Sequence, residues 1–170
     1  MSDFKQIAPE ELDESAFRLV GKDWMLITAG NIDSFNTMAA SWGGLGVIWN
    51  KPVSYCVIRP QRHTRKFMDS GDRFTLCFFD EKYRKALEYC GSHSGRDVDK
   101  VKETGLTPVK SDSGSVYFAE ARIVLDCRKI YIQDIDPAGF IDLSIAVNYP
   151  DKDYHRLYIG EVMKCMIAVK

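Results

Sequence analysis

The segment from Val116 to Ile132, VYFAEARIVLDCRKIYI, constrains the fold more than any other part of the sequence. Apolar and polar residues alternate over much of its length, and a period of two residues is typical of a strand with one buried face. We therefore expect a long, bent, half-exposed strand in a mostly antiparallel sheet. The alternation sets Val116, Phe118, Ala121, Ile123 and Leu125 against Glu120, Arg122 and Asp126.

Four further segments are rich in β-branched and aromatic residues, and this composition favours strands. They are Asp23–Gly30, Val53–Arg59, Arg73–Phe79 and His155–Val169. Gly160 lies inside the last segment, where a glycine predicts a β-bulge.

Short helical stretches lie between these strands, at Thr64–Ser70, at Glu81–Gly91 and at Asp97–Thr104, which Gly105 closes. They do not produce the regular βαβ alternation of a parallel sheet. Long strands with brief helical connections predict a mainly β fold, namely a small closed or partly closed β-barrel with short helices. We expect residues 1–170 to form a single domain.

The nearly equal numbers of basic and acidic residues argue against partners that are strongly charged. Lys and Arg total 23 and Asp and Glu total 24, so the net charge is −1, and neither nucleic acid nor an anionic membrane is an expected partner. No apolar run approaches the roughly 20 residues that span a bilayer, and the acidic beginning MSDFKQIAPEELDES does not predict a leader peptide. The 5 cysteines form no C-x-x-C pair, which indicates reduced core thiols and a cytoplasmic protein.

The stretch Ser41–Pro52, SWGGLGVIWNKP, combines two tryptophans with three glycines. Glycine allows a close approach of the backbone, and tryptophan offers a wide flat face. A ligand groove and ordinary packing both explain this composition, and for Trp49 core or dimer packing is the favoured interpretation.

A basic segment from Arg59 to Phe67, RPQRHTRKF, places Arg59, Arg62 and His63 between a strand end and a helix start. Guanidinium groups and free N–H groups at such a point favour an anion, and a phosphate monoester would fit. We expect Thr64 to cap the helix. The alternative is a solvated basic face with an ordinary capping residue.

A second candidate is Ser92–Lys100, SHSGRDVDK. Ser94 and Asp97 have the spacing of a capping box, and Arg96 and Lys100 add positive charge. This segment is either a second anion-binding loop or simply the start of a helix.

Other chemistries find little support. Cys90 and His93 could be a thiol and a base, but Cys90 falls on the apolar face of its predicted helix. His63, His93 and His155 are too widely separated to predict a metal site, and we expect His155 at a surface or an interface. A chain with anion sites but no acid, base or nucleophile suits an enzyme whose chemistry belongs to a bound cofactor.

Five segments in order resemble the flavin reductase-like family, specifically its flavoredoxin-like branch. They are Asn36–Pro52 (NTMAASWGGLGVIWNKP), Ile58–Thr64 (IRPQRHT), Phe74–Lys100 (FTLCFFDEKYRKALEYCGSHSGRDVDK), Glu103–Pro108 (ETGLTP) and His155–Val162 (HRLYIGEV). The resemblance extends from about Asp23 to the end of the chain. It implies the FMN-binding split β-barrel, in agreement with the fold expected from the strands.

The resemblance also implies a cofactor and its site. FMN would bind without a covalent link in a groove of a homodimer, with NADH or NADPH as co-substrate. The apolar last strand agrees with a dimer. The matching positions imply that the flavin is lined by Thr37, Met38, Ala39 and Ser41. They imply that its phosphate or ribityl chain is held by Arg59, Arg62, His63 and Thr64. The resemblance also implies that a second group lies near the flavin or its phosphate, namely Ser94, Gly95, Arg96 and Lys100.

The resulting leading hypothesis is an NAD(P)H-dependent, FMN-binding oxidoreductase. Hydride transfer between two stacked rings requires no catalytic side chain, which fits the absence of one from the motifs. One alternative is a flavoredoxin-type FMN electron carrier that a redox partner protein reduces, without direct nicotinamide reactivity. Another is a binding module of the same fold without flavin.

Two features leave alternatives open in the sequence. Cys77 stands where many relatives are expected to carry a small polar residue, and it faces either the core or the flavin. Residues 133–153, QDIDPAGFIDLSIAVNYPDKD, form either a lid or a plain helical connection. We favour the connection, because its apolar residues require burial.

Overall fold

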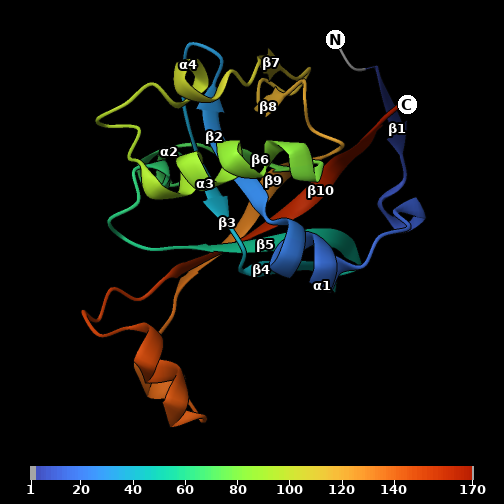
Figure 1. Ribbon diagram of the computed structural model, residues 1–170. Helices are drawn as coiled ribbons and strands as arrows, with labels where there is room; N and C mark the ends of the chain where they lie inside the picture. Colours follow the sequence, from blue (N-terminus) through green and yellow to red (C-terminus); the bar gives the residue numbers. More distant parts are fainter. Residues whose placement is uncertain (1–2, 170) are drawn as a thin grey trace.

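An antiparallel sheet that curls around an apolar core dominates the structure (Figure 1). The computed structural model describes residues 3–169. Its main sheet has 8 strands in the order β3-β2-β6-β9-β10-β5-β4, with β1 paired to β10. The strands are β1 (Phe4–Ile7), β2 (Met25–Asn31), β3 (Ser34–Ala40), β4 (Gly43–Ile48), β5 (Lys51–Ile58), β6 (Arg73–Phe78), β9 (Ile123–Asp134) and β10 (Arg156–Ala168).

The sheet does not close on itself among residues 3–169. Every pairing in it is antiparallel, and none of the described pairings joins β3 to β4. The result is a partly closed barrel, and the mainly β fold with short helices predicted from the sequence is confirmed.

Short helices connect the strands and gather on one side of the sheet (Figure 1). α2 (Thr64–Ser70) and α3 (Arg84–Ser92) pack against β2 and β3, and α4 (Lys100–Thr104) packs against α3. The first two helices were predicted correctly, but the third begins later than expected, because Asp99 caps it by accepting the Lys102 N–H at 3.1 Å. Within residues 3–169, no helix has both the length and the apolar character that crossing a bilayer requires.

The single long strand expected from Val116 to Ile132 is wrong. β8 (Val116–Phe118) pairs with β7 (Pro108–Lys110) in a small separate sheet, and the chain then turns before β9 begins. The turn is closed by the Ala121 N–H, which donates to the Phe118 carbonyl at 3.1 Å. Phe118 and Ala119 are both buried although they are adjacent, so the period of two is broken at this point.

β9 and β10 form the longest ladder of the sheet, and a bulge interrupts it at Gly160 as predicted. A Cβ on Gly160 would lie 2.6 Å from the ring of Phe74 and 2.9 Å from the Cβ of Cys127. Only a glycine allows the bulged backbone to pass this close to the core.

All five cysteines are buried free thiols, as the sequence predicted. Cys77 packs with Leu26, Leu87 and Phe118 in one of two apolar clusters, so it faces the core. Burial raises the pKa of its thiol to about 12. This answers the question that the sequence left open for Cys77.

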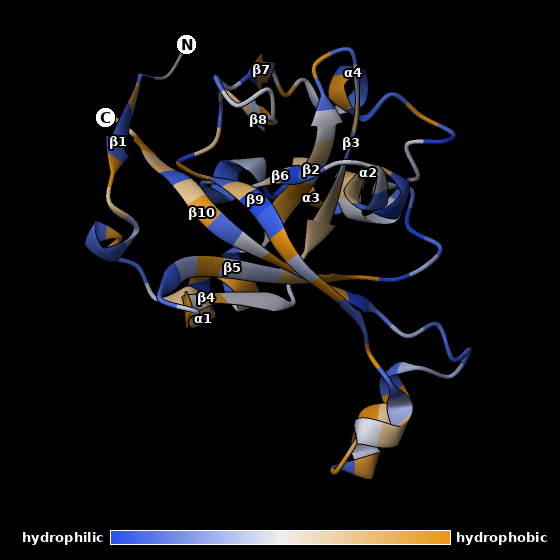
Figure 2. Ribbon diagram, turned by 180° about the vertical axis from the view of Figure 1, so that it is seen from behind, coloured by the Kyte–Doolittle hydropathy of each residue, from blue (hydrophilic) through white to orange (hydrophobic). Residues whose placement is uncertain are grey.

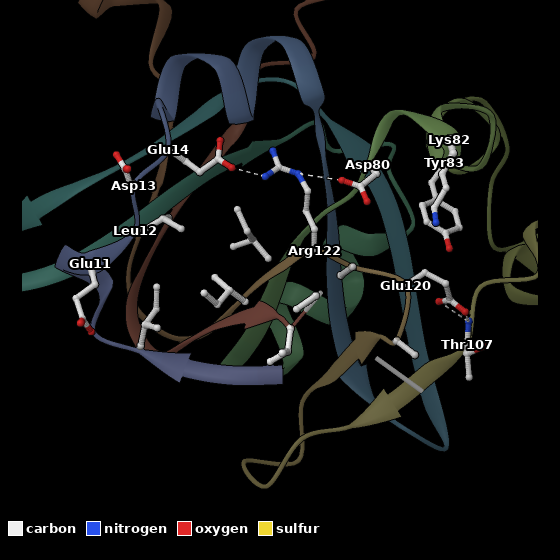
Figure 3. A pocket seen from close by; sticks show the side chains of 17 residues that line it. Glu11, Leu12, Asp13, Glu14, Asp80, Lys82, Tyr83, Thr107, Glu120 and Arg122 are labelled. Carbon is white, nitrogen blue, oxygen red and sulfur yellow. Dashed lines mark hydrogen bonds and ion pairs between the residues drawn. The ribbon is translucent and has the colours of Figure 1, made fainter. Parts of the chain in front are cut away.

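The N-terminal segment lies across the end of the barrel where β10 finishes (Figure 3). Arg122 holds it through ion pairs with Glu14 and with Asp23, the latter at 2.8 Å. A cavity of about 700 Å³ lies between this segment and the sheet. The segment contains η1 (Pro9–Glu11), α1 (Ala16–Arg18) and η2 (Leu19–Asp23).

Residues 135–154 form an arm that projects away from the barrel (Figure 1). It contains the short helices η4 (Pro137–Gly139) and η5 (Leu143–Asn148). The helical character was expected, but burial of the apolar residues within the chain is wrong. Ile141 is 99% exposed and Val147 is 80% exposed.

Asp126 on β9 is a fully buried carboxylate, and a serine loop satisfies it. The hydroxyls of Ser111 and Ser115 donate to it at 2.9 Å each, and that of Ser113 donates at 2.5 Å. These bonds fix the loop between β7 and β8 onto the barrel.

We expect Asp126→Ala to lower the free energy of unfolding by about 2 to 4 kcal/mol. Hydrogen bonds to a charged group are strong, and their loss leaves the three serine hydroxyls without an acceptor. Urea unfolding followed by circular dichroism measures the change. The matched control is Asp112→Ala in the same loop, which removes a surface ion pair with Lys164 and should change stability far less, because solvent screens an exposed pair. Equal losses in the two variants would contradict the role of Asp126.

Candidate functional site

Two hollows meet along β3, and together they contain most of the predicted site. One, of about 640 Å³, follows β3 as far as Thr37, and the other, of about 320 Å³, begins at Met38. We call the first the β3 hollow and the second the groove. The groove is lined by Met38, Ala39, Ala40, Ser41, Trp42, Val57, Arg59, Arg62 and His155.

The structure divides the predicted residues between these hollows. Of the twelve, the groove receives Met38, Ala39, Ser41, Arg59 and Arg62. The β3 hollow receives Thr37, Gly95, Arg96 and Lys100. The other three, which lie outside both linings, are His63, Thr64 and Ser94.

Trp42 and His155 form an aromatic wall of the groove, with ring centroids 5.1 Å apart. The expectation of a surface histidine is wrong, because His155 is buried and its Nδ1 lies 2.8 Å from the hydroxyl of Tyr149, while a place at an interface stays a prediction. Burial, followed by the charge of Arg59, lowers the pKa of His155 to about 4, so the ring is neutral near pH 7. Trp49, by contrast, lies outside the groove and packs on Tyr131 at 5.9 Å.

Arg59 belongs to the groove and also to the root of the arm. Its guanidinium donates to Asp153 at 2.6 Å and to the Asn148 carbonyl at 2.8 Å, and it lies 5.1 Å from the ring centre of Tyr149. Gln61 donates to the same carboxylate at 2.7 Å. Arg59 therefore fixes the arm to the barrel, a role that its sequence context did not indicate.

Arg62 faces the groove from the loop before α2, and its Nη1 donates to the Gly91 carbonyl at 2.7 Å. Burial lowers the pKa of its guanidinium. Gly91 belongs to the last turn of α3, so Arg62 connects the groove to the end of that helix.

His63 provides the clearest sign of a missing partner. Its Nδ1 is buried and has no hydrogen-bond partner within residues 3–169. Burial lowers the pKa of this histidine, and the positive charges of Arg96, Lys66 and Lys100 lower it further. A buried nitrogen without a partner in a positive potential fits an anionic ligand.

Asn36 is a site residue that the sequence reasoning missed. It is buried, and its side-chain amide donates to the hydroxyl of Thr64 at 2.7 Å. A Cβ on Gly95 would lie 1.9 Å from its Oδ1, so the loop around Gly95 rests directly on it. Asn36 thus joins the two basic segments that were predicted separately. Its position directly before Thr37 in a matching segment was the available signal.

Several predicted side chains have structural roles instead of open donors. The hydroxyl of Thr37 points inward to Thr28 at 2.9 Å. Thr64 does not cap α2, because His63 occupies the cap position and Thr64 is the first helical residue. The capping box at Ser94 is also wrong, since residues 94–98 form turns and Ser94 accepts the Arg96 N–H at 3.2 Å.

The cavity beside the N-terminal segment does not fit an anionic ligand (Figure 3). Its rim is acidic, and three of its carboxylates already have partners: Glu14 and Asp80 face Arg122, and Glu120 accepts the Thr107 N–H at 3.0 Å. The groove and the β3 hollow therefore remain the candidate site.

The comparison with protein families agrees with this geometry. The model of the flavin reductase like domain matches residues 17–169. The chain belongs to the flavin reductase-like family. None of the curated proteins compared by sequence gives a significant match.

Solved structures of other flavin reductase-like proteins share the fold. An FMN-binding domain of a flavin reductases-like enzyme from Shewanella baltica OS155 has a TM-score of 0.72 at 19% identity, over 98% of this chain and 78% of that chain. Flavoredoxin of Desulfovibrio vulgaris (Miyazaki F) has a TM-score of 0.67 at 21% identity, over 95% and 76%.

A third neighbour is an NADH:FAD oxidoreductase of Streptomyces globisporus C-1027 in complex with NAD and FAD fragments. Its TM-score is 0.63 at 16% identity, over 85% of this chain and 74% of that chain. Together these likenesses confirm the fold class that the sequence predicted for a flavin reductase-like chain.

We expect Gly95→Ala to weaken FMN binding about tenfold, because the new Cβ displaces Asn36 and with it the contact to Thr64. Fluorescence titration of FMN measures the dissociation constant. Gly21→Ala is the control, since a Cβ there meets nothing within 4 Å. Unchanged affinity in Gly95→Ala would show that Asn36 does not organise the site.

Proposed function

We propose that this chain is an FMN-binding oxidoreductase that uses NADH or NADPH as co-substrate and acts in the cytoplasm. The five buried free thiols support a reducing compartment. Membership of the flavin reductase-like family supports the cofactor class. When bound, FMN supplies the ring that accepts hydride, so the chain itself needs no nucleophile.

The observation that carries the proposal is the unpartnered Nδ1 of His63, on which the positive charges of Arg96, Lys66 and Lys100 act. A phosphate monoester brings oxygens that accept from such groups, and charge-assisted bonds of this kind contribute about 1.5 to 3 kcal/mol each. Arg62 has donors to spare for the same ligand, because only its bond to Gly91 is made among the described residues.

The groove supplies the surfaces that a flat ring requires. Met38 and Ala39 offer apolar contacts from β3, and Trp42 with His155 offers aromatic ones. Because His155 is neutral near pH 7, it adds no positive charge next to the flavin ring. In this arrangement the residues position the ring and exclude water, which is what stacking with a nicotinamide demands.

Anaerobic spectroscopy tests the proposed activity. We expect the FMN-loaded protein to lose the absorption band of oxidised flavin when NADH or NADPH is added, at a rate well above that of free FMN under the same conditions. A band that persists with both nucleotides favours the flavoredoxin-type electron carrier, which a redox partner protein would reduce. A chain that binds no FMN contradicts both functions.

We also propose that the chain forms a homodimer through its arm. Ile141, Leu143 and Val147 are 99%, 79% and 80% exposed, and Figure 2 shows hydrophobic residues along this projection. An apolar helix without cover is unfavourable in water. A second copy supplies matching apolar surface at Tyr55 and Trp49, which are 42% and 54% exposed.

We expect Leu143→Glu to weaken dimerisation at least tenfold, because burial of one leucine contributes about 1.5 to 3 kcal/mol. Light scattering over a dilution series measures the dissociation constant. Ser144→Glu, at the next exposed position of η5, adds the same charge without removing apolar surface and should change little. A monomeric wild-type chain at micromolar concentration would contradict the dimer, and equal effects of the two variants would contradict the role of the arm.

A further inference from the structure

Lys100 is the most deeply buried amine near the candidate site. Its side chain is at the start of α4, and the residue is 6% exposed. The ammonium donates to the Thr37 carbonyl at 2.7 Å and to the Cys90 carbonyl at 2.9 Å. Thr37 belongs to β3 and Cys90 to the last turn of α3, so one amine ties the strand to the helix.

No carboxylate within residues 3–169 forms an ion pair with this amine. Burial has the largest effect on the pKa of Lys100 and lowers it. The thiol of Cys90 raises this pKa and the charge of Arg62 lowers it, and the result is a pKa of about 8. A buried cation without an anionic partner is costly, and such a cost is typical of functional sites.

The carbonyls that hold Lys100 belong to Thr37, which lines the β3 hollow, and to Cys90, which lies next to the site without lining it. Thr37 lies between Asn36 and Met38 on β3, and Cys90 precedes Gly91, whose carbonyl accepts from Arg62 at 2.7 Å. The charge of Lys100 also reaches the unpartnered His63, because it contributes to lowering the pKa of that ring. Lys100 therefore lines the β3 hollow and also fixes the backbone that borders it.

We propose that Lys100 is a positioning residue for the phosphate of the bound flavin, which fixes β3 against α3 and supplies an unscreened positive charge to the anion site. The proposal rests on the proposed FMN binding. It assigns Lys100 the role of fixing the backbone of β3 and α3 through their carbonyls, whereas the sequence resemblance implied only a place near the flavin or its phosphate.

A consequence follows for the dependence on pH. The phosphate favours the protonated amine, so FMN binds more weakly once Lys100 loses its proton in the free protein. Stability of the flavin-free chain changes in the opposite direction. The folded pKa is below the usual value of 10.5, so above about pH 8 the unfolded chain holds more protons and stability rises with pH.

Cys90 and His63, two titratable neighbours of Lys100, have pKa values that are shifted away from this pH range. The charged and titratable groups around Lys100 and His63 are Arg62, Lys66, Cys90, Arg96 and Asp97. The pKa of Cys90 is raised to about 11 by burial, and that of His63 is lowered from 6.5. Between about pH 7 and pH 9 the protonation of Lys100 therefore dominates the local change.

The test is a titration of the full chain with FMN at about pH 7 and about pH 9, followed by fluorescence. For the wild type we expect the dissociation constant to rise up to about tenfold, because a pKa near 8 leaves about one tenth of the amine charged at pH 9. Lys100→Gln should bind about tenfold more weakly at pH 7 and show no further loss at pH 9. Lys102→Gln, an exposed position of the same helix, should behave as the wild type.

Two further measurements complete the design. One is a titration with riboflavin, which lacks the phosphate, and the other is urea unfolding of the flavin-free chain. Riboflavin affinity should not change between the two pH values, while stability should increase in the wild type and less in Lys100→Gln. A purely structural lysine would move affinity and stability together, and that result overturns the proposal. These wild-type measurements decide the matter even if Lys100→Gln does not fold.

Two failures can be told apart. A wild-type FMN affinity that is the same at both pH values overturns the role of Lys100 and leaves FMN binding intact. If the FMN dissociation constant of Lys100→Gln rises with pH as much as that of the wild type, the role of Lys100 is also overturned. Absence of FMN binding at both pH values overturns the proposed function together with the inference.

Discussion

The antiparallel pairing of β9 with β10 is the interaction on which the rest of the structure depends. On its outer sides β9 binds β6, and β10 binds β5 and β1, so both halves of the barrel attach to this one ladder. The bulge at Gly160 lets the ladder bend over Phe74. At its other end the strands run to Asp134 and Arg156, where the arm begins, and β5 ends at Ile58 directly before Arg59. The ladder thus sets the distance between the groove and the arm.

Much of this frame was predictable from composition, and its errors have physical causes. The strands β2, β5, β6 and β10 are rich in β-branched and aromatic residues, and pattern alone identified them. β3, with the sequence SFNTMAA, and β4, with GGLGVI, lack that signal, because pairing with neighbours makes them strands. The break between β8 and β9 was missed because apolar and polar residues continue to alternate through the turn between these strands. Ala119 in that turn is buried, so the turn does not look polar in the sequence.

The candidate site shows where sequence reasoning stops. The resemblance identified basic residues that the fold does bring to two adjoining hollows, but it could not give the direction of each side chain. Thr37 faces inward, Arg59 holds the arm, and Lys100 binds backbone carbonyls. Asn36 escaped notice because its importance lies in a contact with Thr64, 28 residues further along the chain. Long-range contacts of single polar atoms leave no periodic pattern in a sequence.

The distribution of ion pairs separates structural cations from those that are available to a ligand. Among residues 3–169, Arg59 is paired with Asp153, and Arg156 with Asp134, so their charges are largely neutralised within the fold. Arg62, Arg96 and Lys100 have no such pair in the same range and donate to main-chain carbonyls instead. Neutral acceptors hold these side chains in place without cancelling their charge. The remaining positive potential is what an anionic ligand would neutralise, and it is local to these side chains, because the net charge of the whole chain is only −1.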